Sequence, residues 1–199
     1  MSIVVEHEKR RKEILEKALD VFIDSGFENA TFQKIADRCD ITRTTLYLYF
    51  KNKKEIFNYS IKQFLANVEE DIRKIVSDTS RGYIDKLTNI LLIVFNGLDD
   101  NRRLLSVVLH YLLHLSRKNI APERRIRRRT LRLRRFFAYL IIEGIKAGEI
   151  KKVNVKTAVE YLYNFIESAI FQLAILKREN AEDLRKTIIF AVKQLSSGL

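Results

Sequence analysis

Apolar and polar residues follow one another along this chain with the period of an α-helix rather than that of a β-strand. The clearest stretch begins at residue 53 and repeats apolar positions at helical spacing for about six turns. Comparable patterns predict helices over about 8–25, 31–39, 42–50, 83–98, 101–117, 122–148 and 154–176, with a last helix from about 180. These are nine helices without a convincing strand, so we expect an all-α fold.

Residues typical of helix ends stand where the pattern changes. Gly26 follows the first predicted helix, and glycine is favoured just past a helix C-terminus. Thr31 and Thr42 precede the two short helices, where a hydroxyl oxygen can accept a free backbone N–H. Asp40 lies between them, and aspartate tolerates the left-handed conformation that a tight turn requires. Residues 1–7 are expected to form a loosely ordered arm.

The two short helices and the turn between them form the most informative segment. The second helix turns Leu46, Tyr49 and Phe50 inward. Its remaining side chains are expected to face outward: Arg43, Thr44, Thr45, Tyr47 and Leu48. An exposed helix start that carries hydroxyls and an arginine is typical of the recognition helix that a helix-turn-helix places in the DNA major groove.

These residues resemble the DNA-binding domain of TetR-type transcriptional regulators. The resemblance covers roughly residues 9–57 and depends on two groups of positions. They are Ile14, Leu15, Ala18, Phe22, Gly26, Phe27, Ala30 and Thr31 upstream, and Leu46, Tyr47, Tyr49, Phe50 and Lys53 downstream. Asp40 and Thr44 replace glycines that are common in the family, and Leu48 stands where a polar residue or a histidine is frequent. The first replacement is conservative for the fold. The other two change what touches DNA, so they affect the operator sequence but not the docking mode.

The resemblance implies a domain organisation and a function. An N-terminal three-helix helix-turn-helix domain would span 1–52, and a six-helix ligand-binding and dimerisation domain would span 53–199. The protein would be a sequence-specific DNA-binding regulator, most often a repressor, that binds a pseudo-palindromic operator as a homodimer. A small-molecule effector would release it by changing the separation of the two recognition helices.

The candidate DNA contacts divide into base contacts and phosphate contacts. Arg43 is the strongest candidate for a base, since a guanidinium can reach guanine O6 and N7 together. Thr44 and Thr45 offer hydroxyls and methyl groups, and Gln33 can reach a base or a phosphate. By resemblance, Tyr47 and Lys53 contact phosphates. Further phosphate candidates, which can also act only as helix caps, are Thr31 and Thr42.

The helix over 155–176 is apolar nearly all round, which predicts burial on all sides. Packing one side on the core and the other on a second subunit satisfies this pattern, and the resemblance favours a dimer of this kind. The alternative is a central helix in the core of a monomer. The candidate interface residues are Val159, Leu162, Ile166, Ile170 and Leu173, with Leu184, Ile188 and Val192 of the last helix.

The net charge of +12 comes mainly from outside the helix-turn-helix. Residues 1–60 contain 11 basic and 10 acidic residues, whereas residues 122–152 contain 11 basic and 3 acidic ones. The run ERRIRRRTLRLRR at 123–135 is consistent with a solvated helix face, which is the usual role of such runs. It is also consistent with an anionic or acyl-type effector, or with a basic interaction protein that binds RNA or anionic membrane.

Aromatic and histidine side chains are candidates for the lining of a ligand pocket. Its candidates are Phe95, His110, Tyr111, His114, Phe137, Tyr161 and Phe165, all of which could equally be core residues. His110 and His114 stand four residues apart and could address one metal ion. No third ligand of suitable type follows at a matching spacing, so we predict neither a metal site nor a cofactor.

The remaining composition narrows the class of protein further. Three histidines and scattered acidic residues give no catalytic constellation, so an enzyme is not expected. The single cysteine, Cys39, excludes an internal disulfide and fits a reducing compartment. There is no sign of a signal peptide, and the longest nearly apolar run, over 104–115, is far shorter than a spanning helix. We therefore expect a cytoplasmic protein.

Overall fold

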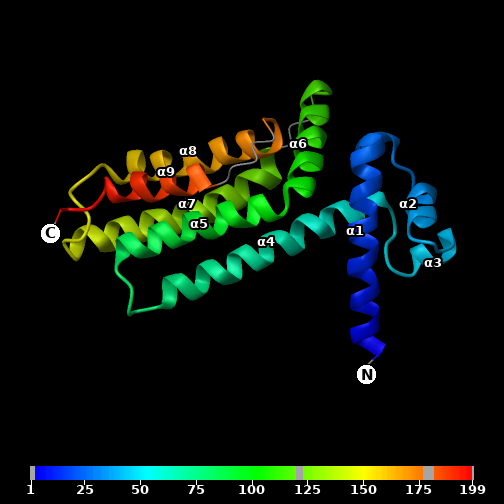
Figure 1. The fold of residues 1–199 in the computed structure, drawn as a ribbon, viewed down its shortest axis with the longest axis horizontal. Coiled ribbons are helices and arrows are strands. Elements are labelled where there is room, and N and C mark those ends of the chain that lie inside the picture. The colour runs from blue at the N-terminus through cyan, green and yellow to red at the C-terminus, as the bar shows by residue number, and fades with distance from the viewer. Residues whose placement is uncertain (1–2, 120–122, 177–181, 199) are drawn as a thin grey trace. The chain divides into compact units, whose positions relative to one another are not determined.

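The computed structural model describes residues 3–119, 123–176 and 182–198, and these residues form nine helices (Figure 1). They are α1 (Ile3–Asn29), α2 (Phe32–Arg38), α3 (Arg43–Tyr47), α4 (Lys53–Ser77), α5 (Tyr83–Asp100), α6 (Arg102–Arg117), α7 (Glu123–Lys146), α8 (Val155–Ala174) and α9 (Glu182–Lys193). The all-α prediction is confirmed. The expected starts of the last helix and of the helix at 122 lie outside the described residues.

The first helix is longer than the sequence pattern predicts. It begins at Ile3, so the described part of the expected loose arm is helical, and that expectation was wrong. The ring of His7 stacks on Tyr49 with 4.7 Å between centroids, and the Tyr59 hydroxyl donates to Glu8 at 3.2 Å. These contacts give the early turns of α1 tertiary partners. The predicted break at Gly26 is confirmed, since this residue has φ 71° and ψ 157°.

The chain divides into two compact units. The first contains Met1–Ala66 and Arg103–Asn119, which are α1 to α3, the first half of α4, and α6. Its core is built from buried aromatic and aliphatic side chains: Phe22, Ile35, Leu46, Phe50 and Phe57. From α6, Val107 is buried in this core and Tyr111 packs against it. The helix α6 therefore folds with the helix-turn-helix.

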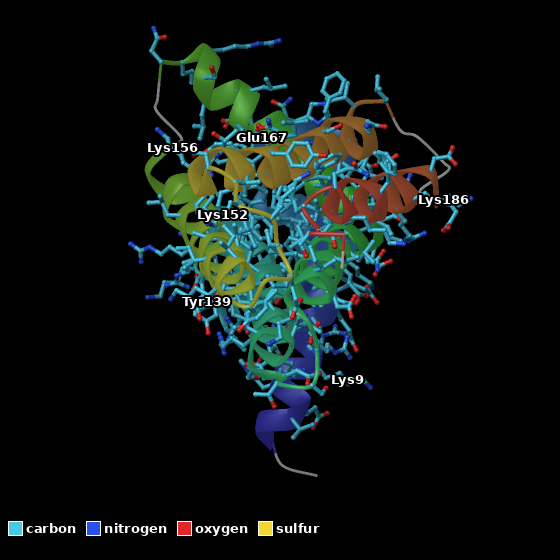
Figure 2. All side chains as sticks on the ribbon, turned by 90° about the vertical axis from the view of Figure 1, so that its left-hand side faces the viewer. Lys9, Tyr139, Lys152, Lys156, Glu167 and Lys186 are labelled. Carbon is cyan, nitrogen blue, oxygen red and sulfur yellow. The ribbon has the colours of Figure 1, made fainter. Side chains whose placement is uncertain are left out.

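The second unit contains Asn67–Arg102 and Ile120–Leu199. Within it α7 packs on α8, and α5 packs on α7, α8 and α9. Its core includes Leu87, Ile90, Phe95, Phe137, Leu140 and Leu162. Tyr139 on α7, Glu167 on α8 and Lys186 on α9 project outward from these helices (Figure 2). In the part of the chain that the structure describes, no helix is long and apolar enough to cross a membrane.

Candidate nucleic-acid interface

Local sequence chemistry sets the geometry of the helix-turn-helix. The Thr31 hydroxyl accepts the backbone N–H of Lys34 at 3.1 Å, and the Thr42 hydroxyl accepts that of Thr45 at 3.0 Å. Between the helices, Asp40 has φ 55°, in the left-handed region. Both predicted caps and the predicted turn are confirmed. They fix the start of α3 on the surface of the first unit.

The exposed side of α3 carries the predicted base contact. Arg43 and Tyr47 lie one turn apart, and the Arg43 guanidinium donates to the Tyr47 hydroxyl at 3.1 Å. The Tyr47 ring also packs on Phe32, with 4.8 Å between centroids, yet it remains 49% exposed. Leu46, in the same helix, is fully buried. A guanidinium is thus held at the surface on an anchored aromatic ring.

The other candidate DNA contacts differ in how freely their polar groups point outward. Thr44 is exposed, whereas the Thr45 hydroxyl lies 2.8 Å from that of Thr42 and is half-buried. The Gln33 amide donates to Asp37 at 2.7 Å on the surface of α2. Thr42 and Thr45 therefore already serve the helix start. Of the two neighbouring threonines in α3, only Thr44 is exposed to solvent.

The side chain of Lys53 has a role that the sequence analysis did not foresee. Its ammonium donates to the carbonyl oxygens of Phe27 and Glu28 at 2.8 and 2.7 Å, and it lies 5.0 Å from the centre of the Phe27 ring. These carbonyls belong to the last turn of α1, where helix carbonyls lack intrahelical partners. Lys53 thus joins the start of α4 to the end of α1, and one donor remains for a phosphate.

The candidate pocket residues fall into both units. Phe95 and Phe137 are buried in the core of the second unit, while Tyr161 is 37% exposed. Phe95 and Phe165 line the same apolar region between α5, α8 and α9, where the remaining space is too small for a water molecule. Phe165 also packs edge-on against Tyr161, with 5.3 Å between ring centroids, so Phe165 meets two other candidates of the second unit.

The candidates on α6 line a groove in the first unit instead. This groove has a volume of about 270 Å³ and includes His110, Tyr111 and His114 together with Phe27 and Glu28. His114 Nε2 lies 3.2 Å from a Glu28 carboxylate oxygen, and His110 Nδ1 lies 2.8 Å from the carbonyl oxygen of Ser106. Among the described residues there is no cluster of three or more potential metal ligands. His110 has a hydrogen-bonding partner within the protein, whereas the buried His114 Nε2 lies near Glu28 without a hydrogen bond.

Two arginines of the Arg-rich run form ion pairs within the second unit. Arg132 pairs with Glu69 at 3.1 Å, and Arg134 pairs with Glu160 while its guanidinium lies 4.3 Å from the centre of the Tyr163 ring. The side chains that the structure describes do not include those of residues 123–130. For Arg132 and Arg134 the carboxylates that neutralise them come from α4 and α8.

The predicted interface residues on α8 and α9 mostly face the core of a single protomer. Buried there are Val159, Leu162, Ile166, Leu173, Ile188 and Val192, whereas Ile170 and Leu184 are half-buried. The apolar side chains that these helices expose are different ones. They are Tyr161, Phe171 and Phe190, with Ile175 and Leu176 directly after α8. The sequence pattern identified the apolar helix but not which of its sides is left open.

The fold and the surface around α3 define a class of protein, a helix-turn-helix DNA-binding protein with an additional helical unit. Residues 14–59 match the family model described as bacterial regulatory proteins, tetR family. The fatty acid metabolism regulator protein of Bacillus subtilis is 28% identical over 170 residues, which cover 82% of this chain and 84% of the relative.

Solved structures share the fold over nearly the whole chain. A TetR transcription regulator from Haloarcula marismortui is 20% identical with a TM-score of 0.74, covering 95% of this chain and 99% of that one. FadR from Bacillus subtilis, in complex with stearoyl-CoA, is 25% identical with a TM-score of 0.67, covering 94% and 98%. Residues 14–59 therefore form a DNA-binding domain of the TetR type, as the resemblance implied. The protein is a DNA-binding regulator rather than an enzyme, as predicted.

Proposed function

We propose that this chain is a repressor that binds a pseudo-palindromic operator as a homodimer and is released by a small-molecule effector. The observation that carries the proposal is the exposed side of α3, where Arg43 rests on Tyr47 beside the free side chain of Thr44. In this proposal Arg43 contacts a base, and Tyr47 contacts a phosphate. The DNA-binding part spans 1–52, and the ligand-binding and dimerisation part spans 53–199. The protein acts in the cytoplasm, together with the DNA that it binds.

The effector in this proposal carries a long acyl chain. The comparisons support it, since the fatty acid metabolism regulator protein of Bacillus subtilis is a relative and the structure of FadR from that species contains stearoyl-CoA. The region between α5, α8 and α9 is lined by apolar side chains, including Phe95, Phe165 and Ile188. It is closed to water in this structure. An acyl chain that enters must separate these helices, so it binds a different conformation better, which is the condition for shifting an equilibrium.

The dimer in this proposal forms through the exposed apolar side chains of α8 and α9. Phe171 is 54% exposed and Phe190 is 66% exposed. Two such aromatic side chains on adjacent helices supply apolar area that association with a second copy would remove from water. The buried residues of the same helices hold the protomer together.

Selection of bound fragments from a random DNA pool at physiological salt tests the proposal. We expect an enriched inverted repeat, because a symmetric dimer reads two half-sites. Addition of stearoyl-CoA should then release the protein from this repeat, while free coenzyme A should not. Binding that is tight and salt-sensitive but without any enriched motif would refute operator recognition. Release by neither compound would refute the acyl effector and leave the operator intact.

A further inference from the structure

The side chain of Leu48 is unusually open to solvent for a large apolar residue. It is 73% exposed, the largest exposed fraction of any large apolar side chain in the part of the chain described. Leu48 directly follows α3 and has helical backbone angles, with φ −67° and ψ −23°. It therefore extends the exposed side of the recognition helix by one residue.

Leu48 shares its side of the helix with Thr44. Residues four positions apart lie one turn from each other on the same face, and Thr44 is also exposed. Arg43 and Tyr47 form a neighbouring pair with the same spacing. The exposed surface of α3 thus has two stripes. One carries a guanidinium and a phenol, and the other carries the methyl groups of Thr44 and Leu48.

A single exposed leucine on a protein surface is ordinary and needs no explanation. Here the leucine stands on the helix that the proposed function places in the major groove. The side chain of Leu48 has no hydrogen-bonding group that could contact a phosphate or a polar base edge. The apolar group that the major groove presents is the C5-methyl of thymine, and no other standard base carries it.

We propose that Leu48, together with the methyl group of Thr44, reads the C5-methyl of thymine at defined positions of the operator. This inference rests on the proposed function, since it needs α3 in the major groove. In this arrangement the Arg43 stripe selects guanine through hydrogen bonds, and the Leu48 stripe selects thymine through apolar contact.

Replacement of each operator thymine by deoxyuridine, one at a time, tests the inference. Deoxyuridine removes only the methyl group and keeps every hydrogen-bonding group of the base. For the wild-type protein we expect about a fourfold loss of affinity at one or two positions in each half-site, the effect of one buried methyl group. Fluorescence anisotropy at fixed salt measures the dissociation constants on the operator that the random-pool selection yields.

Two variants then assign the methyl contacts to residues. Leu48→Ala should bind thymine and deoxyuridine equally at one sensitive position, and Thr44→Ser, which keeps the hydroxyl, should do so at a second. Leu131→Ala is the matched control, because Leu131 is a 44% exposed leucine on α7. This control should keep the wild-type deoxyuridine profile. Thermal unfolding of each variant verifies that the fold is unchanged.

The possible outcomes separate this inference from the proposed function. A specific operator without any deoxyuridine penalty, or one at which every penalty persists in Leu48→Ala, would overturn the inference and leave operator recognition standing. Absence of any specific operator for the wild-type protein would overturn both. Loss of the penalty in Leu131→Ala as well would also count against Leu48, since the effect would not depend on its position.

Discussion

At the scale of single residues, the structure sharpens the role expected of Arg43. Its guanidinium is held by the Tyr47 hydroxyl at the surface rather than by a carboxylate, so no ion pair in the described structure competes with a base. Arg43→Ala should cost about 1–3 kcal/mol of binding free energy and relax discrimination at one base position. Affinities for the selected operator and for its single-base variants check this. Equal losses on every sequence would contradict a base contact.

Cys39 gives a second prediction at the residue scale. It is 3% exposed, and burial raises the pKa of its thiol. The native protein should therefore react slowly with a thiol reagent at neutral pH, and the denatured protein should react fast, because the thiolate is the reactive form. Absorbance of the released reagent anion measures both rates. Fast reaction in the native state would show that the α2–α3 region opens readily.

The raised pKa of Cys39 also predicts how the stability of the protein depends on pH. A raised pKa in the folded state means that the folded protein holds this proton to higher pH than the unfolded chain does. The contribution of Cys39 is therefore fully present below the pKa of a free thiol, about 8.5, and is lost as the pH rises through the folded pKa. Cys39→Ser should remove this loss, which urea unfolding at a series of alkaline pH values can detect.

At the scale of elements, Lys53 connects two helices and makes a third prediction. Lys53→Met keeps the aliphatic stem but removes the donors to the carbonyls of Phe27 and Glu28. Hydrogen bonds from charged groups contribute about 1.5–3 kcal/mol, less where solvent reaches them, so a loss of about 1 kcal/mol is expected in urea unfolding. Lys51→Met, on an exposed lysine, is the control and should leave stability unchanged.

The salt dependence of DNA binding separates the two roles of Lys53. A lysine that contacts a phosphate contributes about one unit to the slope of the logarithm of affinity against that of salt concentration. If Lys53 also binds a phosphate, as the resemblance implies, Lys53→Met should weaken all sequences alike and flatten that slope. An unchanged slope with reduced stability would assign Lys53 to the α1–α4 connection alone.

How far the elements could be predicted from the sequence depends on how local their signals are. The caps at Thr31 and Thr42 and the turn at Asp40 depend on neighbouring residues only, and all three are found. The early turns of α1 were missed, because their partners, Tyr49 and Tyr59, lie some 40 to 50 residues further along the chain. Long-range partners of this kind leave no periodic signal in the sequence.

The same reason explains what was missed in the candidate sites. The bonds of Lys53 to the end of α1 join residues 25 and 26 positions apart. Helical periodicity showed that α8 is apolar, yet a helix apolar on all sides gives no sign of which side meets its own core. The sequence predicted that Leu48 faces outward. Only its exposed fraction of 73% in the structure distinguishes it from the side chains of α3.

At the scale of the whole molecule, α6 groups with the DNA-binding helices. The long fourth helix, α4, contributes residues to both units. In addition, most of α6 belongs to the unit that holds α3, with Val107 buried in its core and Arg103 paired with Asp20. An effector that displaces α6 would therefore act on the DNA-binding unit without passing through α4.

Dimerisation provides the last prediction at this scale. Phe171→Ser combined with Phe190→Ser should convert the dimer to monomers, because it removes the two most exposed aromatic side chains described on α8 and α9. Sedimentation velocity measures the change. The matched control is Tyr139→Ser, since Tyr139 is a 53% exposed aromatic residue on α7 (Figure 2).

The DNA affinity of the same variants connects the interface to function. Monomers keep the α3 surface, so they should still bind a single half-site, with an affinity close to that for one arm of the operator. They should lose the additional affinity that two linked recognition helices gain from an inverted repeat, which reaches factors of about 100 or more in linked systems. A double variant that is still dimeric and binds the full repeat like the wild type would exclude this face as the interface. The contact between subunits would then have to involve another apolar surface of the second unit, such as the exposed Leu131, Tyr139 and Ile142 of α7.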